Sequence, residues 1–259
     1  MREEKNMIRI TKLPKMILFD YGQTLVNEEK FDSIKGDEAV LKLAIKNPNQ
    51  VSVSELQEKA NLISKEIGNA LGEEHRSEQL LEIPAYTFDK YLYEYFGLEF
   101  DVSMDEVQYI FWKHATLGNS FPTNGIEELL DYLWKKGIRT AVVSNMMNSS
   151  KLLERRVNEI LPNNHFEFFI ASSDYVFRKP HKMLFELAIK KAEILPKDIW
   201  FCGDNLLCDI EGSYNAGMTP IYYPAYIDCN YEADTNVPYI KIDSWKELIT
   251  LMEEKKDDC

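Results

Sequence analysis

Apolar segments of β-strand length alternate with amphipathic segments along much of this 259-residue chain. The apolar segments are residues 16–20, 139–144, 166–172, 198–203, 219–223 and 238–242. Helical periodicity marks residues 124–137, 181–195 and 244–256. Gly137 is suited to closing the first of these helices. The first, second and fourth apolar segments lack polar alternation, which is typical of strands covered on both faces. We therefore expect an α/β fold with a doubly wound, mostly parallel sheet.

The long interval between the first two predicted strands breaks this alternation. Residues from about 27 to 118 have helical periodicity and little strand signal. Capping-box patterns, in which a serine precedes a glutamate or glutamine by three residues, begin at Ser52, Ser54 and Ser103. We expect an all-helical domain inserted into the sheet domain. The predicted boundaries are residues 27–117 for the insertion, and residues 1–26 with 118–259 for a discontinuous core domain.

Charge and hydropathy limit the partners of the chain. The net charge of −13 argues against nucleic acid and anionic membrane surfaces, because both require a basic face. No segment approaches the ~18 consecutive apolar residues of a membrane-spanning helix. The first residues lack the apolar core of a signal peptide. We therefore expect a cytoplasmic protein, and the negative net charge does not exclude an anionic small substrate.

Polar residues with catalytic chemistry follow the predicted strands. Asp20 ends the first strand, Ser144 and Asn145 end the second, and Asp204 follows the fourth, with Asp209 five residues further on. Lys179 precedes a predicted helix. Helix capping or solvent exposure could explain each residue separately. In an open α/β sheet, however, ligands bind at the carboxyl ends of the strands, so the convergence of these residues on one edge predicts a functional site.

The order and spacing of these residues resemble a known family. The segments concerned are Asp20-x-x-x-Thr24, Ser144-Asn145, Lys179-Pro180 and Gly203-Asp204-x4-Asp209. They are similar to the four motifs of the haloacid dehalogenase superfamily and span residues 14–26 and 119–242. The resemblance implies a Rossmann-like core, and the helical insertion resembles the type-one cap of that superfamily.

The resemblance also implies a reaction. A small phosphorylated substrate would be hydrolysed with Mg²⁺, and Asp20 would attack phosphorus to form an aspartyl phosphate. The metal ligands would be Asp20, Gly22 through its backbone carbonyl, and Asp204. Asp209 would complete the metal site by binding a metal-bound water or by orienting the neighbouring residues. The phosphoryl group would be held by Ser144, Asn145 through its amide, and Lys179.

Gly22 departs from the family pattern, because phosphatases of the superfamily usually carry an Asp there as general acid and base. A residue of the insertion could replace it, with Glu73, His75 and Arg76 as candidates. A dehalogenase is disfavoured, because Gly203-Asp204 is retained. Two further alternatives stay open. One is a C–P hydrolase similar to phosphonoacetaldehyde hydrolase, and the other is a phosphate- and metal-binding protein of low activity. The lysines available for a Schiff base would be Lys42, Lys46, Lys59 and Lys65. Neither the substrate nor the oligomeric state follows from the sequence.

Overall fold

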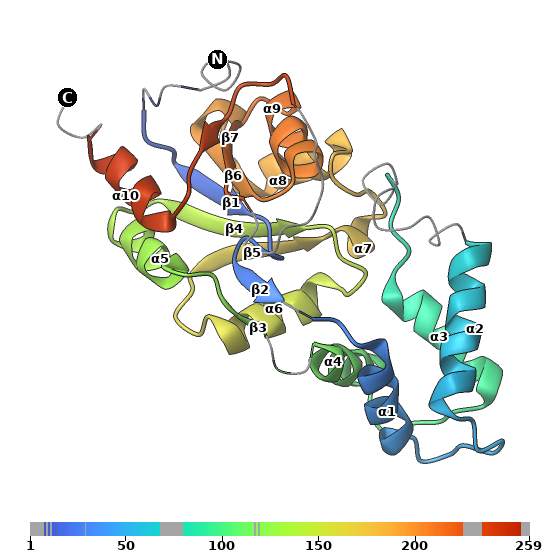
Figure 1. The fold of residues 1–259 in the computed structure, drawn as a ribbon. Coiled ribbons are helices and arrows are strands. Elements are labelled where there is room, and N and C mark those ends of the chain that lie inside the picture. Colours follow the sequence, from blue (N-terminus) through green and yellow to red (C-terminus); the bar gives the residue numbers. More distant parts are fainter. Residues whose placement is uncertain are drawn as a thin grey trace.

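A six-stranded parallel sheet forms the centre of the protein (Figure 1). The computed structural model describes residues 8, 10, 12–28, 30–67, 80–116, 118, 120–224 and 235–254. The strands are β1 (Met16–Phe19), β4 (Arg139–Ser144), β5 (Phe166–Ala171), β6 (Ile199–Gly203), β7 (Thr219–Tyr222) and β8 (Ile240–Lys241). Their order across the sheet is β5-β4-β1-β6-β7-β8, and every pairing is parallel. Each strand coincides with a predicted apolar segment, so the predicted sheet is confirmed.

Helices cover both faces of the sheet, which explains why its central strands are apolar throughout. The regular helices are α5 (Ile126–Lys135), α6 (Ser150–Ile160), α7 (Ser172–Tyr175), α8 (Lys182–Ala192), α9 (Gly212–Asn215) and α10 (Trp245–Glu254). Short turns η3 (Pro196–Asp198) and η4 (Leu206–Glu211) flank β6. Ile17 and Phe19 of β1 pack with α5, α6 and α10, whereas Met16 and Leu18 pack with α8. Gly137 follows α5 with a φ of 68°, as expected of a residue that closes a helix.

In the described part of the insertion, four helices share an apolar cluster of their own. The helices are α1 (Ser33–Leu43), α2 (Val53–Glu66), α3 (Ala85–Phe96) and α4 (Met104–Ala115). Val40, Leu56 and Val107 are fully buried in the cluster, and Figure 1 shows this unit to one side of the sheet. Together with the sheet, the four helices agree with the predicted fold class. The division of the chain into two domains stays a prediction.

Two of the three predicted capping patterns mark real helix starts. Ser52 caps α2 in a complete capping box with Glu55. Ser103 caps α4 by accepting a hydrogen bond from the backbone of Glu106. Ser54, in contrast, lies inside α2. This third pattern was wrong as a capping site, because the box that begins two residues earlier already starts the helix.

A short antiparallel ribbon joins the insertion to the sheet. Strand β2 (Val26–Glu28) leads into the insertion and pairs with β3 (Ser120–Pro122), which leads out of it. The first predicted boundary, after residue 26, falls within β2, and the second, before residue 118, lies two residues before β3. Its three-residue strands contain Asn27, Glu28 and Pro122, residues with low strand propensity, so they escaped prediction. Among the described helices, none is long and apolar enough to cross a bilayer.

Candidate active site

The carboxyl ends of the central strands bring the predicted residues together. Phe19 of β1 lies between Val142 of β4 and Cys202 of β6 in the sheet register, so the residues that follow these strands meet at one edge. A cavity of about 360 Å³ opens at this edge. It is lined by Asp20, Tyr21, Gly22, Glu28, Ser144, Asn145, Met146, Arg178, Lys179, Asp204, Asn205, Cys208 and Asp209. All seven residues predicted from the sequence are in this set, whereas their chemical roles stay predictions.

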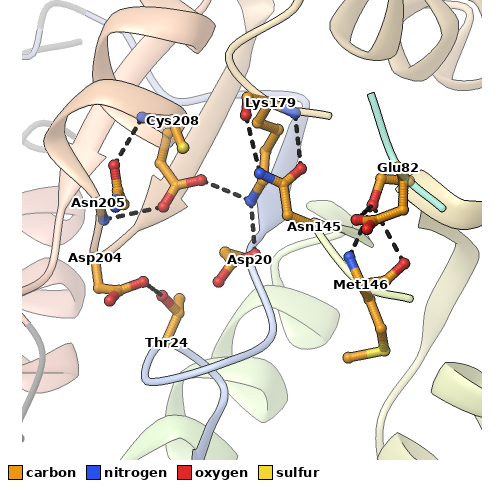
Figure 2. A network of polar contacts seen from close by, with 11 residues as sticks. Asp20, Thr24, Glu82, Asn145, Met146, Lys179, Asp204, Asn205 and Cys208 are labelled. Atoms are coloured by element: carbon orange, nitrogen blue, oxygen red, sulfur yellow. Dashed lines mark hydrogen bonds and ion pairs between the residues drawn. The ribbon is translucent and has the colours of Figure 1, made fainter. Parts of the chain in front are cut away.

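Lys179 links two of the acidic residues (Figure 2). Its Nζ donates to Oδ1 of Asp20 and to Oδ1 of Asp209, each at 2.6 Å. Burial alone would lower the pKa of Lys179, but the two carboxylates outweigh burial and raise it. The lysine is therefore protonated, and it holds Asp20 and Asp209 in fixed positions.

Three carboxylates form a compact acidic cluster beside this lysine. Asp20, Asp204 and Asp209 each offer an oxygen, and these oxygens lie within 4.8 Å of one another. Burial, and then the charges of Asp20 and Asp209, raise the pKa of Asp204 well above its ordinary value. Within the described part of the chain, Asp204 has no basic partner and contacts Thr24 Oγ1 at 3.5 Å. Buried oxygen donors with excess negative charge fit a hard cation such as Mg²⁺.

The turn after β6 places Asp209 against the strand. Asn205 accepts hydrogen bonds from the backbone of Leu207 and Cys208 and so caps η4. Asp209 Oδ2 accepts from the Asn205 backbone at 3.0 Å. A Cβ at Gly203 would overlap the Asp209 side chain, so only glycine permits this close approach.

The side chain of Asn145 has a role that the sequence did not reveal. Its Nδ2 donates to the Lys179 carbonyl at 2.9 Å, and its Oδ1 accepts from the Lys179 amide at 2.7 Å (Figure 2). The side chain thus fixes the backbone of the loop that carries the lysine. Its backbone amide, the group predicted to bind phosphoryl oxygen, is on the same residue and adjoins Ser144.

The segment before α3 attaches the insertion to the core near Lys179. Glu82 is buried and accepts from Arg178 Nη1 and, at 2.7 Å, from Ser172 Oγ. Backbone hydrogen bonds add to this contact, from Glu82 to Val176 and from Arg178 to Leu80. Figure 2 shows Glu82 beside the site. A single glutamate carries no sequence signal for such a pairing, so Glu82 was not predicted.

The candidates proposed for the insertion fall into two groups. Glu73, His75 and Arg76 lie outside the described residues. None of the four lysines is among the residues that line the cavity: Lys46 pairs with Glu99, and Lys59 lies over the ring of Tyr95. The geometry therefore offers no support for a Schiff-base lysine.

Comparisons with known proteins identify the family and relatives of this chain. The family model described as haloacid dehalogenase-like hydrolase matches residues 17–222. A glyceraldehyde 3-phosphate phosphatase from Pyrococcus furiosus is 24% identical over 93% of this chain and 94% of its own length. A mouse haloacid dehalogenase-like hydrolase domain-containing protein 3 is 34% identical, over 36% of each chain.

Solved structures share the fold at low sequence identity. An HAD phosphatase from Thermococcus onnurineus has a TM-score of 0.57 at 18% identity and covers 92% of this chain and 97% of its own. A 2-haloacid dehalogenase from Pseudomonas syringae has a TM-score of 0.59 at 19% identity, with 93% and 99% coverage. At such identities the likeness concerns the fold alone.

Proposed function

The chain belongs to the haloacid dehalogenase-like hydrolase family, and we propose that it is a Mg²⁺-dependent phosphatase acting on a small phosphorylated substrate. The observation that carries the proposal is the buried Lys179, which bridges Asp20 and Asp209 next to Asp204. A carboxylate nucleophile for phosphorus requires a fixed position and compensation of negative charge. In this cluster, the hydrogen bond from Lys179 fixes the position of the Asp20 carboxylate.

In the proposed reaction Asp20 is the nucleophile. Lys179 occupies Oδ1 of Asp20, which leaves Oδ2 to attack phosphorus. The P–O bond to the leaving group breaks and an aspartyl phosphate forms. Water then attacks the phosphorus, which releases inorganic phosphate and restores the carboxylate. A Mg²⁺ ion bound by Asp20, Asp204, Asp209 and the Gly22 carbonyl would screen the repulsion between carboxylate and phosphate.

Other residues of the cavity would hold the transferred group. Ser144 ends β4 and the backbone amide of Asn145 follows it, so both can donate to phosphoryl oxygens at the sheet edge. Donors fixed before the reaction stabilise charge that develops in the transition state. The two hydrogen bonds between the Asn145 side chain and the Lys179 backbone hold the lysine in a fixed position relative to these donors.

The test is hydrolysis of an aryl phosphate by the parent protein and by Asp20→Asn. Removal of the nucleophile should lower kcat by at least about 10³-fold, because no other group can form the covalent intermediate. Chelation of divalent cations should abolish activity, and Mg²⁺ should restore it. An Asp20→Asn variant with most of the parent activity would contradict the proposal.

A binding protein of low activity makes a different prediction. In that case, Mg²⁺ or inorganic phosphate would raise the melting temperature of the parent protein, because a ligand that binds the folded state stabilises it. No phosphate ester would be hydrolysed faster than by Asp20→Asn. The same two measurements therefore separate the enzyme from the binding protein.

A further inference from the structure

Gly22 leaves a catalytic requirement unmet. An alkoxide is a poor leaving group, so efficient cleavage of an alkyl phosphate needs a proton donor in the transition state. No described atom lies within 4 Å of the point where a Gly22 Cβ would stand. Gly22 lines the cavity together with Asp20, and no described acidic side chain occupies the space beside Gly22.

Glu28 supplies a carboxyl group to the same cavity. Among the described residues that line it, the acidic side chains are those of Asp20, Asp204, Asp209 and Glu28. The first three form the cluster around Lys179, where negative charge accumulates. Glu28 stands apart on β2, eight residues beyond the nucleophile, and its side chain is 21% exposed. Glu28 is therefore neither a partner of Lys179 nor a member of the predicted metal site.

The surroundings of Glu28 hold one oxygen and leave the other available. Oε1 accepts from Tyr21 Oη at 2.7 Å and from Ser120 Oγ at 3.2 Å, and Arg156 Nε lies 3.9 Å away. Tyr21 and Glu28 both line the cavity. Within the described part of the chain, Oε2 has no hydrogen-bond partner. The carboxyl group is therefore oriented through Oε1, and Oε2 can exchange a proton with a bound molecule.

We propose that Glu28 replaces the acid missing at position 22 and transfers the proton to the leaving group. In the first step, protonated Glu28 gives its proton to the ester oxygen while the P–O bond breaks and Asp20 forms the aspartyl phosphate. In the second step, the Glu28 carboxylate takes a proton from the water that attacks the phosphorus. The net reaction is ester plus water to alcohol plus phosphate, and Glu28 ends protonated as it began. This inference rests on the proposed phosphatase function.

The test compares an aryl phosphate, whose phenol leaves without help, with an alkyl phosphate, whose alcohol does not. Glu28→Gln should lower kcat for the alkyl ester by about 10²-fold or more and leave the aryl ester within about threefold, because general acid catalysis matters only for the poor leaving group. Glu99→Gln is the matched control, because Glu99 pairs with Lys46 on the surface and does not line the cavity. It makes the same chemical change at a distance from the site, so both esters should keep the parent rate.

A second variant tests the same idea by rescue. Gly22→Asp in the Glu28→Gln background should recover at least about tenfold of the lost alkyl-ester activity, because the space beside Gly22 is open and the new acid stands next to the nucleophile. In the otherwise parental protein, Gly22→Asp should give less than about a threefold gain, because Glu28 already provides the proton.

The outcomes separate this inference from the proposed function. Equal losses for both esters in Glu28→Gln, no loss for either, or a large gain from Gly22→Asp alone would each overturn the role of Glu28, while the phosphatase proposal would stand. If Glu28→Gln does not fold, the Gly22→Asp single variant still decides. A parent protein no faster than Asp20→Asn on the aryl ester would overturn the phosphatase function, and the role of Glu28 with it.

Discussion

Gly203 is required by the packing of a single side chain. A Cβ at this position would overlap the side chain of Asp209, which itself is held by Lys179 and by the Asn205 backbone. Gly203→Ala should therefore displace Asp209 or the turn after β6. Overpacking of this kind costs about 1–3 kcal/mol of unfolding free energy. Chemical denaturation measures this cost, and hydrolysis of an aryl phosphate should fall at the same time.

Gly22→Ala is the control for this prediction, because its Cβ would meet no described atom within 4 Å. Its unfolding free energy should differ from that of the parent by less than about 0.5 kcal/mol. Equal destabilisation by the two alanine variants would contradict the argument from the Asp209 contact.

Among single residues, those that end or directly follow a predicted strand, or precede a predicted helix, could be identified from the sequence. Asp20, Ser144, Lys179 and Asp204 were predicted, and all of them line the cavity. Glu28 and Glu82 were not. Tyr21 is close to Glu28 in the chain, but Ser120 lies 92 positions beyond Glu28 and Arg178 lies 96 positions beyond Glu82. Such pairings depend on how the insertion meets the core, which local patterns do not specify.

The segment before α3 is an element whose contribution can be measured. The Glu82–Arg178 pair is buried, with side-chain exposures of 3% and 13%. Glu82→Gln leaves a buried guanidinium without its charged partner, and breaking a buried pair costs about 3–5 kcal/mol. We expect the unfolding free energy in urea to fall by about that amount.

Glu99→Gln is the matched control, because Glu99 pairs with Lys46 on the surface. Both of these side chains are more than half exposed, so the change should cost less than about 1 kcal/mol. Similar losses for Glu82→Gln and Glu99→Gln would show that the buried pair contributes no more than a surface pair.

Helices and strands were predicted correctly where the hydrophobic pattern within the segment is sufficient to determine the structure. The central strands β1, β4 and β6 are nearly continuous apolar runs, because they are buried on both faces of the sheet. Helix α6 escaped, although Ser149 caps it, because charged residues interrupt its apolar pattern. The ribbon of β2 and β3 escaped because its pairing, and not its composition, makes it a strand pair.

For the molecule as a whole, a buried acid in the insertion links stability to pH. Burial raises the pKa of Asp89 to about 7, with Asp37 adding to the effect and the hydrogen bond from Gln108 opposing it. The folded state then binds more protons than the unfolded state between about pH 4 and pH 7, so stability falls as pH rises through this window. Melting temperatures between pH 5 and pH 8 measure this dependence.

Asp89→Asn should remove the part of this dependence that Asp89 contributes, because asparagine carries no proton to lose. Asp37, whose pKa burial raises to about 6, should keep its own part. Between pH 5 and pH 8 the stability of the variant relative to the parent should increase by about 2–3 kcal/mol. Asp101→Asn, at an exposed position, should melt as the parent does at both values. A constant difference between Asp89→Asn and the parent at all pH values would contradict the role of ionisation.

The attachment at Glu82 connects the position of the insertion with the position of Lys179. Residues 80–82 form hydrogen bonds with residues 176–178, and Lys179 is the next residue in the chain. If the insertion swung away from the sheet, these bonds would break, and the loop that positions the lysine would lose its support. Admission of a substrate and alignment of Asp20 by Lys179 would then belong to one conformational equilibrium, in which opening the cavity would also release the loop that carries the lysine.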